Sequence, residues 1–88
     1  MAQNFEAGLL RVLTAGGVTM GAGFLIGDRL VLTCAHVVCK AGYMPDQSIQ
    51  LKFHHNDQSV QATVLPKFWR DTEKEDLAVL RLELETLP

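Results

Sequence analysis

One histidine and one aspartate in this chain occupy positions from which side chains can transfer protons. His36 lies in "LVLTCAHVV" at 30–38, after a run of apolar residues, and Asp76 directly precedes "LAVLRL" at 77–82. An imidazole takes up and releases a proton near neutral pH, which suits it to general acid–base catalysis. A carboxylate at the mouth of a buried strand needs a partner, because burying it unpaired is costly. We therefore predict that Asp76 pairs with Nδ1–H of His36, which leaves Nε2 directed outward as a base.

The elements that must position these two residues are short strands. Alternating apolar and polar residues, separated by Gly, Asp and Asn, predict strands over 8–14, 18–26, 30–34, 48–54, 59–66 and 76–84, and a short helical turn over 35–39. Six short strands with so little helix predict an all-β fold, an antiparallel barrel or sandwich. Closure into a barrel would remove the exposed strand edges.

The alternation also predicts which side chains face the core. The inward set is Ile49, Leu51, Phe53, Val60, Ala62 and Val64. The strand at 30–34 is apolar throughout, so we expect it to be buried on both faces. Gly21 and Gly23 indicate a bulge or a close approach of another part of the chain.

Length and composition exclude several classes of protein. Eighty-eight residues predict a single domain over 1–88, and a net charge of −2 without a basic stripe argues against a nucleic-acid partner. Neither a membrane-spanning apolar run nor a signal peptide is recognisable, so we expect a cytoplasmic protein with no membrane association. In a reducing compartment Cys34 and Cys39 should be free thiols, and we expect both to be small buried side chains.

Two stretches resemble segments of trypsin-like (chymotrypsin-fold) serine peptidases. "GAGFLIGDRLVLTCAHVV" at 21–38 is similar to the strand–turn–strand that leads to their catalytic histidine, and "DLAVLRL" at 76–82 is similar to the segment that bears their catalytic aspartate. The resemblance implies that His36 is the general base and that Asp76 orients it. It also implies a six-stranded antiparallel Greek-key barrel, the first of the family's two barrels.

The nucleophile of that family normally lies in the second barrel, in a G-x-S-G-G context. The only serines here, Ser48 and Ser59, lack those glycines. We therefore expect half of a serine endopeptidase, inactive without a C-terminal barrel and acting on polypeptides once completed. Because "GAGFLI" contains no cysteine for the disulfide of secreted members, the resemblance points to the bacterial, intracellular type.

Other readings stay open. Cys34, Cys39, His36, His54 and His55 invite a zinc site, but their spacing fits structural zinc poorly, so we expect no metal and no cofactor. A non-catalytic, protease-like module that binds peptides or proteins is the alternative function. If a second barrel is missing, an apolar wall including Leu80, Leu82 and Leu84 should be exposed, and the chain should form homo-oligomers.

Overall fold

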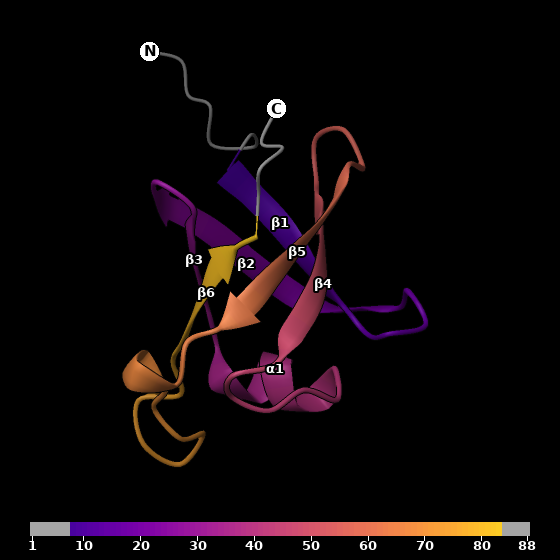
Figure 1. The fold of residues 1–88 in the computed structure, drawn as a ribbon. Helices are drawn as coiled ribbons and strands as arrows, with labels where there is room; N and C mark the ends of the chain where they lie inside the picture. Colours follow the sequence, from indigo (N-terminus) through magenta and orange to yellow (C-terminus); the bar gives the residue numbers. More distant parts are fainter. Residues whose placement is uncertain (1–7, 84–88) are drawn as a thin grey trace.

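The fold is a closed barrel of six antiparallel strands (Figure 1). The structure is a computed structural model that describes residues 8–83. The strands are β1 (Leu9–Leu13), β2 (Thr19–Gly27), β3 (Leu30–Thr33), β4 (Ser48–Phe53), β5 (Ser59–Val64) and β6 (Ala78–Leu82). One short helix, α1 (Ala35–Lys40), follows β3, and a 3₁₀ turn, η2 (Pro66–Phe68), follows β5. The predicted all-β class and the six strands are confirmed.

The strand order around the barrel is β1-β2-β3-β6-β5-β4, with β4 closing back onto β1. The first three strands are joined by turns, and the fourth returns to lie beside the first, which is the Greek-key arrangement. This order places β3 against β6, with Thr33 opposite Ala78. The residues just after β3 and just before β6 therefore meet at one end of the barrel.

The barrel interior holds the core, built from alternate residues of each strand. The fully or nearly fully buried side chains of the strands include Leu10, Val12, Val31, Ile49, Leu51, Phe53, Ala62, Val64, Ala78, Leu80 and Leu82. The inward positions predicted for β4 and β5 are confirmed, except that Val60 is only partly buried against the core. Alternation of apolar and polar residues suffices to predict the inward side chains, because one face of the barrel wall lines the core and the other faces solvent.

Strand β3 is less buried than the sequence suggests. Val31 and Thr33 are buried, whereas Leu30 and Leu32 are half-buried. The expectation of a strand buried on both faces was wrong because only one face of a barrel strand lines the interior. An apolar residue on the outer face of β3 is partly open to solvent.

Strand β2 approaches its neighbours closely at two glycines. A Cβ on Gly21 would lie 2.7 Å from both methyl groups of Val37, and one on Gly23 would lie 2.8 Å from a methyl group of Val31. The predicted close approach is confirmed, and a bulge lies beside it, since the pairing of β1 with β2 shifts between Val12 and Leu13. Gly21 thus lets α1, which carries Val37, pack directly against β2.

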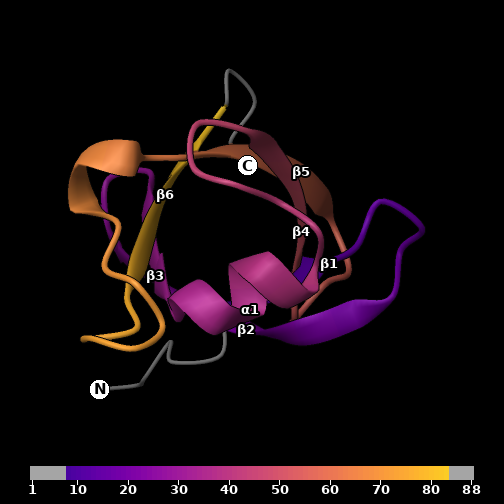
Figure 2. The same cartoon turned by 90° about the horizontal axis from the view of Figure 1, so that it is seen from below.

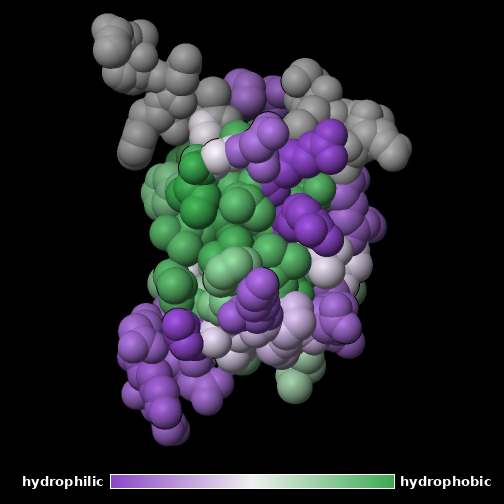
Figure 3. Space-filling view, turned by 60° about the vertical axis from the view of Figure 1, so that its left-hand side comes forward, coloured by the Kyte–Doolittle hydropathy of each residue, from purple (hydrophilic) through white to green (hydrophobic). Residues whose placement is uncertain are grey.

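The exposed apolar surface differs from the one we expected. Leu80 and Leu82 belong to the core, at 0% and 2% exposure, because their positions in β6 point into the barrel. Leu84 lies outside the described residues. The exposed large apolar side chains are instead Val18, Phe24, Leu25, Ile26, Met44 and Phe68, three of them on β2. Figure 3 shows hydrophobic side chains gathered on one side of the barrel.

Candidate active site

His36 is held at one end of the barrel by α1, which begins directly after Cys34. Viewed along the barrel, α1 lies across this end (Figure 2). Ala35, Val37 and Val38 are the buried side chains of the helix, whereas His36 is exposed. Packing three of four consecutive residues against the barrel fixes the helix and leaves the imidazole at the surface.

Asp76 is held at the same end by the connection into β6. Arg70 and Leu77 exchange two backbone hydrogen bonds, of 2.9 and 3.1 Å, and so close the loop between them. The backbone N–H of Asp76 donates to the carbonyl of Asp71 at 3.0 Å. Asp76 itself has a φ of +54°, a left-handed conformation that aspartate tolerates better than most residues. The side chain of Asp76 therefore takes a direction that the regular strand geometry of β6 would not give it.

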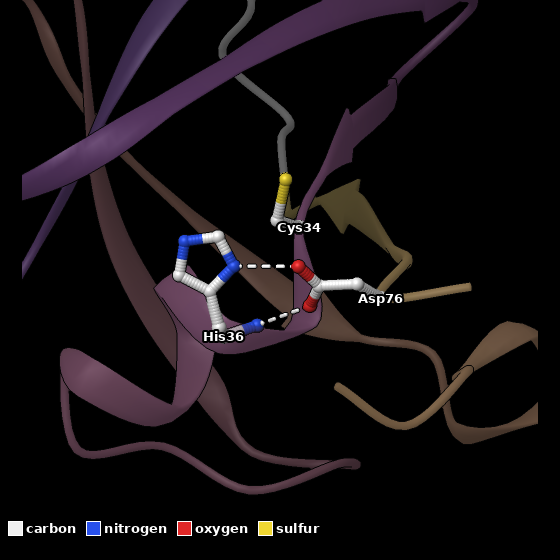
Figure 4. A group of neighbouring side chains, drawn as sticks. All are labelled: Cys34, His36 and Asp76. Carbon is white, nitrogen blue, oxygen red and sulfur yellow. Dashed lines mark hydrogen bonds and ion pairs between the residues drawn. The ribbon is translucent and has the colours of Figure 1, made fainter. Parts of the chain in front are cut away.

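The two side chains meet as the sequence predicted (Figure 4). Nδ1 of His36 lies 2.6 Å from Oδ2 of Asp76, and the backbone N–H of His36 donates to Oδ1 at 2.8 Å. Half of the His36 side chain and 28% of the Asp76 side chain are exposed. Asp76 is thus half-buried rather than buried, and both of its oxygens are occupied by one residue.

These contacts favour the ionised form of the carboxyl group. The hydrogen bond from the His36 side chain is the main reason that the pKa of Asp76 lies below its ordinary value of 3.8. The backbone N–H of His36 lowers this pKa further, and partial burial only opposes the shift. Asp76 is therefore an anion at neutral pH and accepts from Nδ1–H, so the lone pair of Nε2 is free to take a proton.

The two serines lie at the starts of barrel strands and not at this site. Ser48 begins β4 and its hydroxyl donates to the carboxylate of Glu83 at 3.0 Å, which Thr63 also reaches at 2.7 Å. Ser59 begins β5 at the exposed surface. Among residues 8–83, neither serine is hydrogen-bonded to His36 or Asp76.

Cys34 lies beside the pair, and in the sequence we considered it with His36 but not with Asp76. Donor atoms of Cys34, His36 and Asp76 all lie within 4.8 Å of one another. Within residues 8–83, Cys39, His54 and His55 take no part in such a group. Both cysteines are free, as predicted, but Cys34 is half-buried and Cys39 is exposed, so the expectation of two buried thiols was wrong. Cys39 lies on the outer side of α1, where the barrel cannot cover it.

Only one feature of the sequence could have indicated that Cys34 lies near the pair, namely its position two residues before His36. The helix begins between these two residues. Side-chain direction changes at such a junction, so neither strand nor helix periodicity predicts it.

Within residues 8–83, no helix combines the length and the apolar character needed to cross a membrane.

Comparison with known proteins agrees with the barrel fold. No curated protein matches the chain. Residues 21–88, which include both His36 and Asp76, match the family described as the trypsin-like peptidase domain. The match covers more than half of the sequence and takes in most of β2 and all of β3 to β6 of the closed barrel, while β1 precedes it. The chain therefore belongs to the family of trypsin-like peptidase domains.

Proposed function

We propose that this chain is the part of a serine endopeptidase that supplies the general base, His36, and the carboxylate that orients it, Asp76. The observation that carries the proposal is the double hydrogen bond from one carboxylate to the ring and the backbone of the same histidine. That arrangement fixes both the ring orientation and the tautomer before any substrate arrives.

The proton transfers follow from the geometry. Nε2 of His36 takes the proton of an attacking hydroxyl and later gives it to the leaving amine. Between these steps the ring is an imidazolium, and the anionic Asp76, 2.6 Å from Nδ1, stabilises that charge. Asp76 keeps its negative charge throughout.

The nucleophile is proposed to come from a second barrel outside residues 1–88. Ser48 is engaged with Glu83 at the barrel wall, and Ser59 lies at the start of β5, so neither is placed as a nucleophile. An oxyanion hole would have to come from the same second unit. By itself the 88-residue chain is then expected to hydrolyse no peptide, and the completed enzyme is expected to act on polypeptides.

The surface that such a second barrel, or a second copy of the chain, would cover is the exposed apolar part of β2 around Leu25 and Ile26. The two residues are 37% and 53% exposed, and adjoining exposed apolar residues favour an interaction surface. A cytoplasmic location is part of the proposal and is supported by the two free thiols.

The same exposed apolar residues favour a second candidate, a non-catalytic module that binds a peptide or protein through β2. The two candidates make different demands on His36. A binding module needs only the surface of β2, whereas a peptidase needs the imidazole.

The test is active-site labelling of protein expressed together with any coding sequence that follows residue 88. A fluorophosphonate probe should attach to a serine outside residues 1–88, and His36→Ala should abolish the labelling. Binding of unmodified peptides without any labelling would favour the non-catalytic module.

A further inference from the structure

The proposed mechanism uses two members of a group of three. Cys34 lies between β3 and α1, His36 in the first turn of α1 and Asp76 before β6, and one donor atom from each lies within 4.8 Å of the others. Figure 4 shows the thiol of Cys34 beside the hydrogen-bonded pair. Proton transfer through His36 and Asp76 requires no thiol, so the proposed mechanism gives Cys34 no part.

We propose that Cys34, His36 and Asp76 bind a thiophilic divalent cation, with Zn²⁺ as the representative ion, and that the bound cation switches off His36 as a base. The second part rests on the function proposed above. The first part stands on the group of donor atoms alone.

The donor types select the class of cation. Thiolate, imidazole and carboxylate are the three ligand types that proteins use for Zn²⁺, whereas Ca²⁺ and Mg²⁺ take oxygen ligands. Three protein ligands leave a fourth, tetrahedral position for water. Two anionic ligands, the thiolate of Cys34 and the carboxylate of Asp76, would balance the charge of the ion.

The distances are close to those that a cation needs. With Zn–N and Zn–O bonds of about 2.0–2.1 Å and a Zn–S bond of about 2.3 Å, donor atoms in a tetrahedron lie about 3.3–3.6 Å apart. Nδ1 of His36 and Oδ2 of Asp76 are 2.6 Å apart and must separate slightly, while the thiol at up to 4.8 Å must approach. Both movements are about 1 Å and are available to side chains that are partly exposed.

We take Nδ1 as the ring ligand because that nitrogen already faces the carboxylate. Oδ1 of Asp76 can keep its 2.8 Å hydrogen bond to the backbone N–H of His36, which would orient the carboxylate in the metal-bound state.

The protons that move on cation binding explain why His36 could no longer act as a base. Cys34 loses its thiol proton to solvent when sulfur binds the cation, so one proton is released for each ion. The imidazole stays neutral, and its proton moves from Nδ1 to Nε2 when the cation takes Nδ1. Nε2 then carries a hydrogen and cannot accept one, so the outward-facing nitrogen changes from an acceptor to a donor.

The direct test is cation binding by the 88-residue chain, with any affinity tag removed. Co²⁺ titration should give one equivalent bound with a thiolate-to-cobalt charge-transfer band, and Zn²⁺ competition with a chromophoric chelator should give the affinity. Cys34→Ala and Asp76→Asn should each weaken Zn²⁺ binding by at least about tenfold, the size of effect seen even for indirect ligand partners. Cys39→Ala and His54→Gln are the matched controls and should bind as the parent does.

Circular dichroism shows whether each variant is folded, and His36→Gln provides a second ligand variant if Asp76→Asn is unfolded. Absence of the charge-transfer band, full affinity in Cys34→Ala, or loss of binding in Cys39→Ala would overturn the site.

The consequence for His36 is read separately by NMR. In the parent chain Zn²⁺ should move the ring proton of His36 from Nδ1 to Nε2, and an unchanged tautomer with the cation bound would overturn the switch. Neither readout involves catalysis, so loss of the proposed peptidase function would leave the cation site standing. Loss of the cation site would likewise leave the His36–Asp76 pair as described.

Discussion

The carboxylate of Asp76 bonds His36 at two points, the ring nitrogen Nδ1 at 2.6 Å and the backbone N–H at 2.8 Å. The backbone contact holds the aspartate whether or not the imidazole turns, and the ring contact then selects one orientation of the imidazole. The pair therefore behaves as one unit built from two distant parts of the chain, one after β3 and one before β6.

The first prediction concerns the tautomer of His36. In metal-free protein above neutral pH, the ring proton should reside on Nδ1, because the ionised Asp76 accepts it. Asp76→Asn should shift the population toward the Nε2–H form, since the amide can also donate to Nδ1. Long-range ¹H–¹⁵N correlation spectra measure both states, and Asp28→Asn in the β2–β3 turn is the control. A tautomer that is the same in Asp76→Asn and the parent would contradict the pairing.

The second prediction concerns acid stability. The pKa of Asp76 in the folded chain lies below the ordinary value of 3.8 that the unfolded chain restores, so its ionised form stabilises the fold. This contribution should be fully present above pH 3.8 and should be lost as the pH falls through the lower, folded-state pKa. Urea unfolding of metal-free protein across this range should show a shallower acid loss for Asp76→Asn than for the parent. Parallel curves for the two proteins would mean that Asp76 does not titrate in contact with His36.

The third prediction concerns the packing that holds α1. Gly21→Ala would place a Cβ 2.7 Å from the methyl groups of Val37, and such overpacking typically costs about 1–3 kcal/mol of unfolding free energy. Gly27→Ala is the matched control, because nothing lies within 4 Å of a Cβ at Gly27 and the two glycines share strand β2. Chemical denaturation measures both.

A double-mutant cycle with Val37→Ala refines that test. Removing the methyl groups should relieve the clash, so Gly21→Ala should cost less in the Val37→Ala background. Equal costs of Gly21→Ala and Gly27→Ala would show that β2 and α1 are not in contact at this point.

Several of these features were predictable from the sequence, and particular residues show why. Ile49, Leu51 and Phe53 alternate with polar residues, so one periodicity gave both the strand and its buried face. The pairing of His36 with Asp76 was predicted because a carboxylate next to an apolar strand needs a partner, and the order of the two motifs resembled a known family.

Other features depend on three-dimensional context that no local pattern carries. From the sequence we expect Leu80 and Leu82 to lie on an exposed wall. In the structure, the pairing of β6 with β3 points both side chains into the barrel. The left-handed backbone of Asp76 and the direction of the Cys34 side chain arise where one element ends and the next begins. At such junctions the period of neither element applies.

The fourth prediction concerns association. Leu25 and Ile26 on β2 leave apolar surface open to solvent, and we expect the 88-residue chain to dimerise or form larger species at micromolar concentration. Ile26→Lys should shift the mass measured by light scattering toward the monomer, while Met44→Lys, at an exposed residue between α1 and β4, should not. A monomeric parent chain would mean that the exposed apolar residues of β2 do not drive association.

Peptide hydrolysis is the measurement that tests the central claim most directly. We expect protein extended past residue 88 by its own coding sequence to cleave a peptide library, and the 88-residue chain alone to show no turnover. In the extended protein, His36→Ala should lower kcat by about 10⁴-fold or more and Asp76→Asn by about 10⁴-fold, as loss of these groups does in serine peptidases. His54→Ala, at an exposed histidine after β4, should leave the rate unchanged. Cleavage that survives His36→Ala, or turnover by the 88-residue chain itself, would contradict the assignment of His36 as the base of a two-part serine endopeptidase.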